Sequence, residues 1–146
     1  MIDRFEGQYD FLSNFYPSPF VWKERTYPTV EHFFQAHKAK TQEDFEFIMR
    51  QSTPSGSKWA GRQVELRSDW EDIKDTVMMT ALRLKFTQNP ELKEKLLATG
   101  NEQLIEGTTW HDQYWGICTC PRCGGKGKNH LGILLMKLRE ELRNDT

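Results

Sequence analysis

The sequence has neither a strong net charge nor a long apolar run. Its 146 residues include 20 Lys and Arg against 21 Asp and Glu, which leaves a formal net charge of -1. A chain so close to neutral has no overall electrostatic attraction to nucleic acid or to an anionic membrane. No segment approaches the roughly 18 uninterrupted apolar residues of a membrane-spanning helix. We therefore expect no membrane partner, and any phosphate must be recognised by local groups.

Secretory features are missing too. The first residues, Met1 to Gly7, contain no apolar region of the kind found in a signal peptide. The chain has only three cysteines, Cys118, Cys120 and Cys123, and their close spacing excludes a disulfide framework that spans the chain. Both observations predict a cytoplasmic protein.

Internal repeats, Gly/Ser linkers and low-complexity tracts are also absent. The length lies near the mode for one domain, and we expect a single domain over residues 1–146. Aromatic residues, in contrast, are abundant, with nine Phe, five Trp and four Tyr. Together with an ordinary share of charged residues, they indicate a globular chain with one core.

Helix signals predict a mainly α fold of five or six helices with a few short N-terminal and mid-chain strands. Residues 1–28 alternate aromatics with Pro, Ser and Asn, which favours two short strands over a long helix. Thr29 is a good N-cap for a helix over 30–40, and Thr41 for a second helix that ends in the breaker cluster 52–56.

The second half of the chain contains two further helix starts. Ser68 and Glu71 have capping-box spacing, and Asn89 precedes Pro90 as a cap precedes the first helical residue. Gly100 supplies a left-handed stop. The expected elements are a short helix over 58–64, helices over 69–87, 90–99 and 131–142, a brief strand over 104–107 and a loop over 108–128.

The predicted helix 30–40 holds the first candidate chemistry. Glu31 and Lys38 are seven residues apart and share a face, with Gln35 between them. A carboxylate and an amine would then line one wall of a site. The alternative is a solvated helix face with a weak charge ladder.

Two further candidates lie in aromatic surroundings. Asp112 sits in a loop with Trp110 and Trp115, whose rings could exclude water around the carboxylate, or Asp112 could simply form a turn. Trp70, at a helix start, could stack on a flat base or pack in the core.

These features, in order, resemble the NADAR family, also called the YbiA-like family. The resemblance rests on five separated motifs: FLSNF at 11–15, YPTVEHFFQAHK at 27–38, Asp69-Trp70, Asp112-x-x-Trp115-Gly116 and Asn129-x-Leu131-Gly132. It implies a mainly helical N-glycosidase. Some members cleave phosphoribosylamino-pyrimidine intermediates of riboflavin synthesis, and others remove ADP-ribose from modified guanine in DNA or RNA. The alternative is a non-catalytic module that binds ADP-ribose or a related nucleotide.

The resemblance implies catalytic roles for Glu31, Asp112 and Lys38. Cleaving a ribose C1-to-nitrogen bond builds positive charge at C1, so one carboxylate can stabilise that charge while another acts as the acid. Which carboxylate takes which role stays open. Lys38 could form an imine with the ring-opened sugar. The expected substrate-binding residues are Asn14, Gln35, Arg62, Trp70, Trp115 and Asn129.

Substrate phosphates need donors. Lys58, Arg62 and Arg67 flank the middle of the chain, and the glycine-rich segment 124–129 leads into the last predicted helix, which suits an anion. The segment is not a P-loop, because Asn129 follows Lys128 where that motif needs Ser or Thr. A mobile basic loop is the alternative.

The cysteines depart from the family pattern. Only Cys120 and Cys123 form a C-x-x-C pair, and a structural zinc site can be drawn with Cys118 and with His111 or His130 as the fourth ligand. Because paired knuckles are missing, reduced thiols are preferred. We expect no cofactor and no catalytic metal, and the sequence leaves the oligomeric state open.

Overall fold

Threonine side chains begin three helices in the first half of the chain. The computed structural model describes residues 1–145. Each of the three helices follows a threonine whose hydroxyl accepts a hydrogen bond from the backbone N–H three residues on. The helices are α1 (Val30–His37) after Thr29, α2 (Gln42–Met49) after Thr41, and α3 (Pro54–Gly61) after Thr53. The first two caps were predicted, and both are confirmed.

The third helix corrects the prediction of a helix over 58–64. It begins at Pro54, because Thr53 caps the helix and Pro54 occupies its first turn, where a missing N–H costs nothing. Helix α1 is also shorter than expected. It ends at His37, and Lys38 is its C-terminal cap.

The next two helices begin close to the expected residues, although α4 follows a different cap. α4 (Trp70–Gln88) follows Asp69, so the predicted capping box of Ser68 is wrong. α5 (Pro90–Ala98) begins at the predicted proline. Asn89 directly precedes α5 and also caps the end of α4, where its amide donates to Lys85 O at 2.8 Å.

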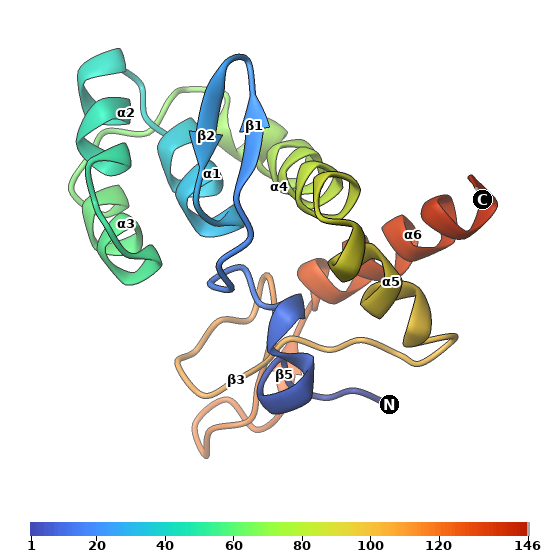
Figure 1. Ribbon diagram of the computed structural model, residues 1–146. Coiled ribbons are helices and arrows are strands. Elements are labelled where there is room, and N and C mark those ends of the chain that lie inside the picture. The colour runs from blue at the N-terminus through green and yellow to red at the C-terminus, as the bar shows by residue number, and fades with distance from the viewer. Residues whose placement is uncertain (146) are drawn as a thin grey trace. The chain divides into compact units, whose positions relative to one another are not determined.

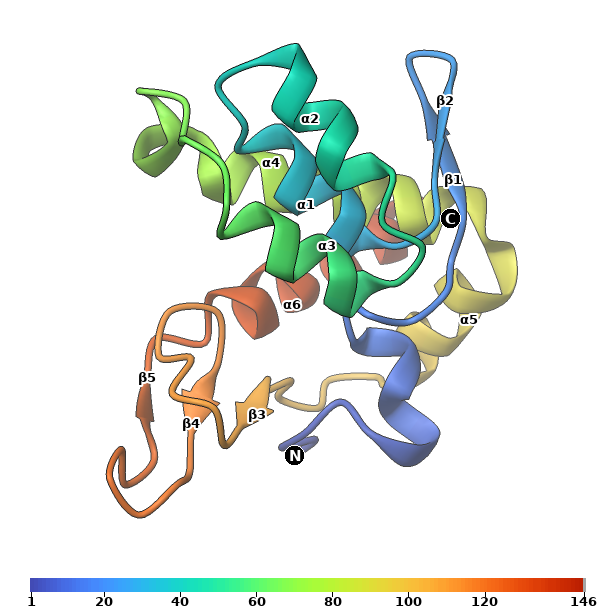
Figure 2. The same ribbon diagram turned by 90° about the vertical axis from the view of Figure 1, so that its left-hand side faces the viewer.

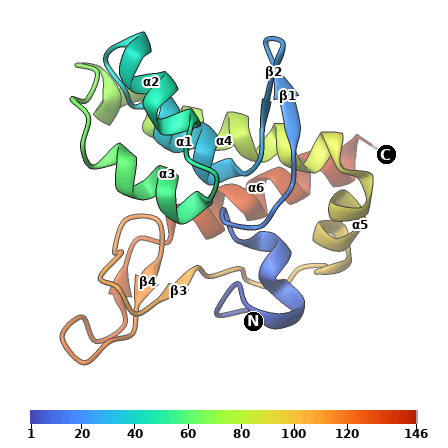
Figure 3. The ribbon, with the colours of Figure 1, turned by 60° about the vertical axis from the view of Figure 1, so that its left-hand side comes forward.

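Residues 14–89 form one compact unit. The predicted pair of short strands is confirmed as an antiparallel hairpin of β1 (Phe20–Trp22) and β2 (Arg25–Tyr27), seen in Figure 3. Its turn residues Lys23 and Glu24 both have positive φ, as a two-residue hairpin turn requires. Helix α1 packs against α2, α3 and α4, so it is the central helix of this unit (Figure 2).

An aromatic cluster holds α1 to the hairpin. Phe33 is buried, and its ring centroid lies 4.0 to 5.8 Å from those of Phe20, Trp22, Tyr27 and His37. Truncating a buried phenylalanine of this kind costs about 3–5 kcal/mol of stability. The cluster therefore fixes the position of α1 and of the side chains that α1 carries.

Residues 1–13 together with residues 90–145 form the second unit. Its helices are η1 (Gly7–Leu12), α5 and α6 (His130–Asn144), and α5 packs against α6 (Figure 1). A three-stranded sheet has the order β3 (Gly107–Thr108), β4 (Ile117–Cys118), β5 (Lys126–Gly127), with β3–β4 parallel and β4–β5 antiparallel.

These strands correct two expectations. The strand expected over 104–107 begins only at Gly107, because Leu104 makes a single bridge to Ile2. The expected loop 108–128 contains β4 and β5, whose two-residue length is too short to leave an alternating pattern in the sequence.

The predicted mainly helical class with a few short strands is confirmed over the described residues. The terminal helix expected over 131–142 is confirmed and slightly longer. Within residues 1–145, no helix combines the length and the apolar character needed to cross a membrane. The single domain over 1–146 stays a prediction.

Candidate active site

Helix α1 carries a polar pair in the interior of its unit. The Glu31 side chain is 7% exposed and that of Gln35 is 5% exposed. Gln35 Nε2 donates to Glu31 Oε1 at 2.7 Å, and the backbone N–H of Glu31 donates to Asn14 O at 3.1 Å. A buried carboxylate costs stability unless it is hydrogen-bonded. The hydrogen bond from Gln35 therefore offsets part of the cost of burying the Glu31 carboxylate and fixes its orientation.

Lys38 lies at the end of the same helix and is partly buried. Burial lowers the pKa of its ammonium group. The charge of Glu31 opposes that shift, whereas Arg62 and Lys58 lower the pKa further. An amine with a lowered pKa is neutral more often near neutral pH, which makes it a better nucleophile.

Gly61, the last residue of α3, packs directly on this side of α1. A methyl group added at Gly61 would lie 2.0 Å from Gln35 Oε1 and 2.7 Å from Lys38 Cε. A side chain at this position would have to displace the amide of Gln35 or the end of Lys38. Sequence reasoning missed Gly61, since its role comes from the packing of two helices and leaves no local signal.

Two buried acceptors of this unit have no donor. Among the described residues, neither Asn14 Oδ1 nor Gln35 Oε1 accepts a hydrogen bond. The amide nitrogen of Asn14 makes only a long contact, 3.6 Å, to Met78 Sδ. An unsatisfied buried acceptor costs about 1–3 kcal/mol. Both atoms are suited to accept hydrogen bonds from the hydroxyl groups of a ligand.

The other predicted binding residues of this unit differ in accessibility. Trp70 is buried, and its ring centroid lies 5.0 Å from that of Phe34, which agrees with the packing alternative. Arg62 is exposed. Arg67 is held by Asp69, with Nε at 2.6 Å from the carboxylate. Arg62 is therefore more available to a phosphate than Arg67.

In the second unit, Asp112 forms a turn. Its Oδ1 accepts from the backbone N–H of Tyr114 at 3.1 Å and of Trp115 at 2.9 Å. This is the structural role that the sequence left open. It occupies one carboxylate oxygen, and Oδ2 takes no part in these two bonds. The half-buried Trp115 ring packs edge-on against Tyr114, at 4.8 Å between centroids.

Asn129 joins three segments of the same unit. Its Nδ2 donates to Leu104 O at 2.9 Å, and its Oδ1 accepts from the N–H of Glu106 at 3.0 Å. Its own N–H donates to Gly116 O at 3.3 Å. The amide is thus committed to the backbone, and Asn129 positions the start of α6.

The three cysteines and one histidine converge in this unit. The ligand atoms of His111, Cys118, Cys120 and Cys123 all lie within 4.8 Å of one another, so the group could hold a metal ion. His111 Nδ1 lies 3.3 Å from the sulfur atoms of both Cys120 and Cys123. The other histidine considered, His130, stacks on Tyr114 at 4.2 Å instead.

The thiol of Cys118 differs in acidity from an ordinary cysteine. Burial raises its pKa, but hydrogen bonds from the backbone at Cys120 and His111 outweigh that effect and, with the neighbouring thiols, lower the pKa to about 6. A low pKa favours the thiolate, which is the form that binds metals.

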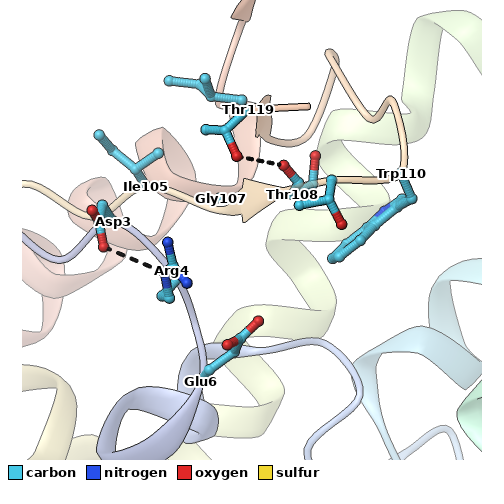
Figure 4. A pocket seen from close by; sticks show the side chains of 10 residues that line it. Asp3, Arg4, Glu6, Ile105, Gly107, Thr108, Trp110 and Thr119 are labelled. Atoms are coloured by element: carbon cyan, nitrogen blue, oxygen red, sulfur yellow. Dashed lines mark hydrogen bonds and ion pairs between the residues drawn. The ribbon is translucent and has the colours of Figure 1, made fainter. Parts of the chain in front are cut away.

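Two hollows of this unit lie away from the predicted residues. One of about 180 Å³ is bordered by Arg4, Glu6, Thr108 and Trp110 (Figure 4). Ligand pockets usually measure about 300–1,000 Å³, so this one is small for a nucleotide. A shallower one of about 640 Å³ is lined by Tyr9, Phe11 and Lys95, among others. Neither contains a predicted site residue.

Comparison with known proteins gives consistent matches. The family model of the NADAR domain matches residues 3–143. The N-glycosidase YbiA of Escherichia coli (strain K12) is 45% identical over 136 residues, 92% of this chain and 82% of that protein. A riboflavin biosynthesis protein of Vibrio vulnificus (strain YJ016) is 36% identical over 94% of this chain, but only 37% of that protein. The NMR structure of E. coli YbiA matches with a TM-score of 0.83 and 40% identity, covering 99% of this chain and 88% of that one. The expected YbiA-like fold is thereby confirmed.

Proposed function

We propose, because this chain belongs to the NADAR domain family, that it is an N-glycosidase acting on a ribose that carries phosphate. The reaction breaks the bond between C1 of the ribose and a nitrogen of the base. Water supplies the hydroxyl group that C1 keeps and the proton that the departing nitrogen takes. No metal or redox cofactor is needed to balance this reaction.

The proposal rests on the buried polar groups in the interior of the unit formed by residues 14–89. There Gln35 donates to the buried carboxylate of Glu31, and two buried acceptors of the same unit, Asn14 Oδ1 and Gln35 Oε1, have no donor among the described residues. Ribose hydroxyl groups are donors that would satisfy both acceptors. A carboxylate near the sugar can then stabilise the positive charge that develops at C1.

We assign Glu31 the role of stabilising this charge and Asp112 the role of the second carboxylate. Support for Glu31 is its burial and its fixed orientation by Gln35. Support for Asp112 is the family resemblance, together with a carboxylate held in a turn by two backbone donors. Arg62 and Trp115 are proposed to contact the phosphate and the base. Trp70 and Asn129 are proposed to shape the site through packing and backbone contacts.

Lys38 offers a covalent variant of the same reaction. Its neutral amine would attack C1 of the ring-opened sugar, the base nitrogen would leave with a proton, and water would later hydrolyse the imine. Since burial lowers the pKa of Lys38, the neutral fraction rises with pH through that lowered pKa. The rate should rise with pH over the same range.

Borohydride added during turnover tests the covalent variant. It should reduce the imine and leave a stable sugar adduct on Lys38, found by peptide mass spectrometry. Lys38→Met provides the matched control, because it keeps the length of the side chain without the amine. Turnover without any adduct on Lys38 would leave the direct attack of water as the route.

The substrate class separates two possibilities. One is a phosphoribosylamino-pyrimidine, supported by the match to a riboflavin biosynthesis protein and by the net charge of -1, which gives no general attraction to nucleic acid. The other is ADP-ribosylated guanine in DNA or RNA, which a local site can bind without a basic stripe.

A metal at His111 and the cysteines would be structural in both cases, because none of these side chains is proposed to touch the ribose.

Parallel incubation of the purified protein with both substrates tests the proposal. One reaction contains an oligonucleotide with ADP-ribosylated guanine, and the other contains the phosphoribosylamino-pyrimidine. Mass spectrometry then measures the released base and sugar. Release from either one supports an N-glycosidase and identifies its substrate class. Binding of both without release would contradict the enzyme and favour a nucleotide-binding module.

A further inference from the structure

Backbone hydrogen bonds to sulfur connect the residues of the group formed by His111, Cys118, Cys120 and Cys123. The backbone N–H of His111 donates to Cys118 Sγ at 3.3 Å, and the N–H of Cys123 donates to Cys120 Sγ at 3.4 Å. Backbone donors that point at sulfur stabilise thiolates and orient them as metal ligands. All four residues belong to the same compact unit.

The distances suit a tetrahedral ion. Zinc binds thiolate sulfur at about 2.3 Å and imidazole nitrogen at about 2.0 Å, which places ligand atoms roughly 3.5–3.8 Å apart around the metal. The four ligand atoms here lie within 4.8 Å of one another, and His111 Nδ1 is 3.3 Å from two of the sulfur atoms. Small adjustments of the side chains would place all four on one ion.

A tight backbone turn brings the cysteines of this group close together. The turn after Cys120 brings the N–H groups of Cys123 and Gly124 back to Cys120 O, at 3.1 and 2.8 Å. Gly124 and Gly125 have φ of 63° and 83°, which glycine adopts without strain. His111 also has a positive φ of 70°, an unusual conformation for a residue with a side chain. It is the residue that carries the only nitrogen ligand of the group.

The ligand types decide between metals. Three sulfurs and one imidazole are too soft a set for Mg²⁺ or Ca²⁺, which take oxygen ligands. Iron–sulfur clusters are generally held by four cysteines, or by two cysteines and two histidines, and this group has three cysteines and one histidine. A disulfide would join two of the three cysteines and leave the third unused, whereas a Cys₃His zinc site uses all four side chains.

We propose that His111, Cys118, Cys120 and Cys123 bind one structural zinc ion that fixes the loop between β3 and α6. Strands β3, β4 and β5 are only two residues long, and such short strands provide little stability on their own. The zinc ion ties His111 to the β4–β5 hairpin. His111 immediately precedes Asp112, so the ion also restricts the turn in which that carboxylate is held.

Metal analysis of the full-length protein tests the site directly. After expression with zinc and gel filtration, elemental analysis should find one zinc per chain. Protein refolded with Co²⁺ should show the intense visible bands of a tetrahedral site and a thiolate-to-metal charge-transfer band. Protein that binds neither metal, with all three thiols reacting freely with a thiol reagent after zinc is added, would overturn the proposal.

Two substitutions distinguish the ligands. His111→Gln should lower zinc content and shift the cobalt spectrum, whereas His130→Gln should leave both unchanged, because His130 stacks on Tyr114 outside the group. Cys123→Ser should weaken zinc binding at least tenfold, and Arg122→Ala, in the same turn, should not. Equal zinc content in His111→Gln and wild type would contradict the assigned histidine.

Hydrogen exchange links the ion to the turn of Asp112. Removing zinc with a chelator should speed amide exchange in peptides covering residues 108–118 but not in peptides of α1, which lies in the other unit. Unchanged exchange in 108–118 would show that the ion does not fix this loop. These readouts do not require glycosidase activity, so they can fail or succeed independently of the proposed reaction.

Discussion

The two units of this chain fix their candidate catalytic side chains by different kinds of backbone structure. In residues 14–89, Glu31 and Gln35 stand one turn apart on α1, a capped helix packed against three others. In the other unit, Asp112 stands in a loop among two-residue strands. A helix fixes the spacing of its side chains by backbone geometry alone, whereas a loop needs hydrogen bonds or a metal to fix a side chain.

The two arrangements differ in their cost to stability. The helical unit buries two acceptors, Asn14 Oδ1 and Gln35 Oε1, that have no donor among the described residues, which lowers the stability of the free protein. In the loop unit, the polar groups of Asp112 and Asn129 are satisfied by backbone partners. Removing the charge of Glu31 should therefore lower activity with little loss of stability, whereas removing the acceptor of Asp112 should lower both.

The largest effect is expected from Glu31→Gln. A glutamine can still accept the hydrogen bond from Gln35 Nε2, so the change removes the charge and keeps the contact. We expect kcat to fall about 10²- to 10⁴-fold, the usual range for a catalytic carboxylate, with Tm unchanged or raised. Glu43→Gln, exposed in the first turn of α2, is the matched control. A large drop in Tm with activity preserved would make Glu31 a structural residue.

Two substitutions at Asp112 separate the role of its charge from the role of its turn. Asp112→Asn keeps an oxygen for the N–H groups of Tyr114 and Trp115, so we expect about a hundredfold loss of kcat with little change in Tm. Asp112→Ala removes the acceptor too and should also cost about 0.5–2 kcal/mol of unfolding free energy. If Asp112→Asn retains full activity and only Asp112→Ala is impaired, the residue serves the turn alone.

A smaller effect is expected at Gly61. The added methyl group of Gly61→Ala would displace Gln35 or Lys38, at a cost of about 1–3 kcal/mol in stability and roughly tenfold in kcat/KM. Gly56→Ala in the same helix is the control, because its methyl group would meet Thr53 Oγ1 at 3.1 Å instead. Equal behaviour of the two variants in thermal unfolding and kinetics would contradict a special role for Gly61.

Local signals account for what the sequence predicted correctly. The caps of α1 and α2 lie next to the helices that they begin, and the i, i+4 spacing of Glu31 and Gln35 is a property of any helix. The motif resemblance identified the family before any contact was known. Each of these features is readable within a few residues of the chain.

Features that depend on distant contacts could not be read in this way. Gly61 matters because α3 approaches α1, and the fold places His111, not the equally considered His130, beside Cys120 and Cys123. The amide of Asn129 is committed to Leu104 and Glu106, which lie more than twenty residues earlier in the chain. Sequence spacing alone carries no signal for contacts of this kind.

The start of α3 lies between these two cases and allows the smallest test. The composition of Ser52 to Gly56 is typical of a helix breaker, yet its Thr53–Pro54 pair is a cap followed by a first-turn proline. Thr53→Ala removes the acceptor for the Gly56 N–H and should cost about 1 kcal/mol. For a chain of this size, that corresponds to roughly 2–5 °C in Tm. Ser52→Ala, on the exposed neighbouring residue, should change Tm by less.

The same variant also tests how α3 affects the site. Because the cap of Thr53 lies at the far end of α3 from Gly61, kcat of Thr53→Ala should stay within a factor of two. A tenfold loss would mean that the position of the whole helix, and not the glycine alone, sets the geometry at Gln35.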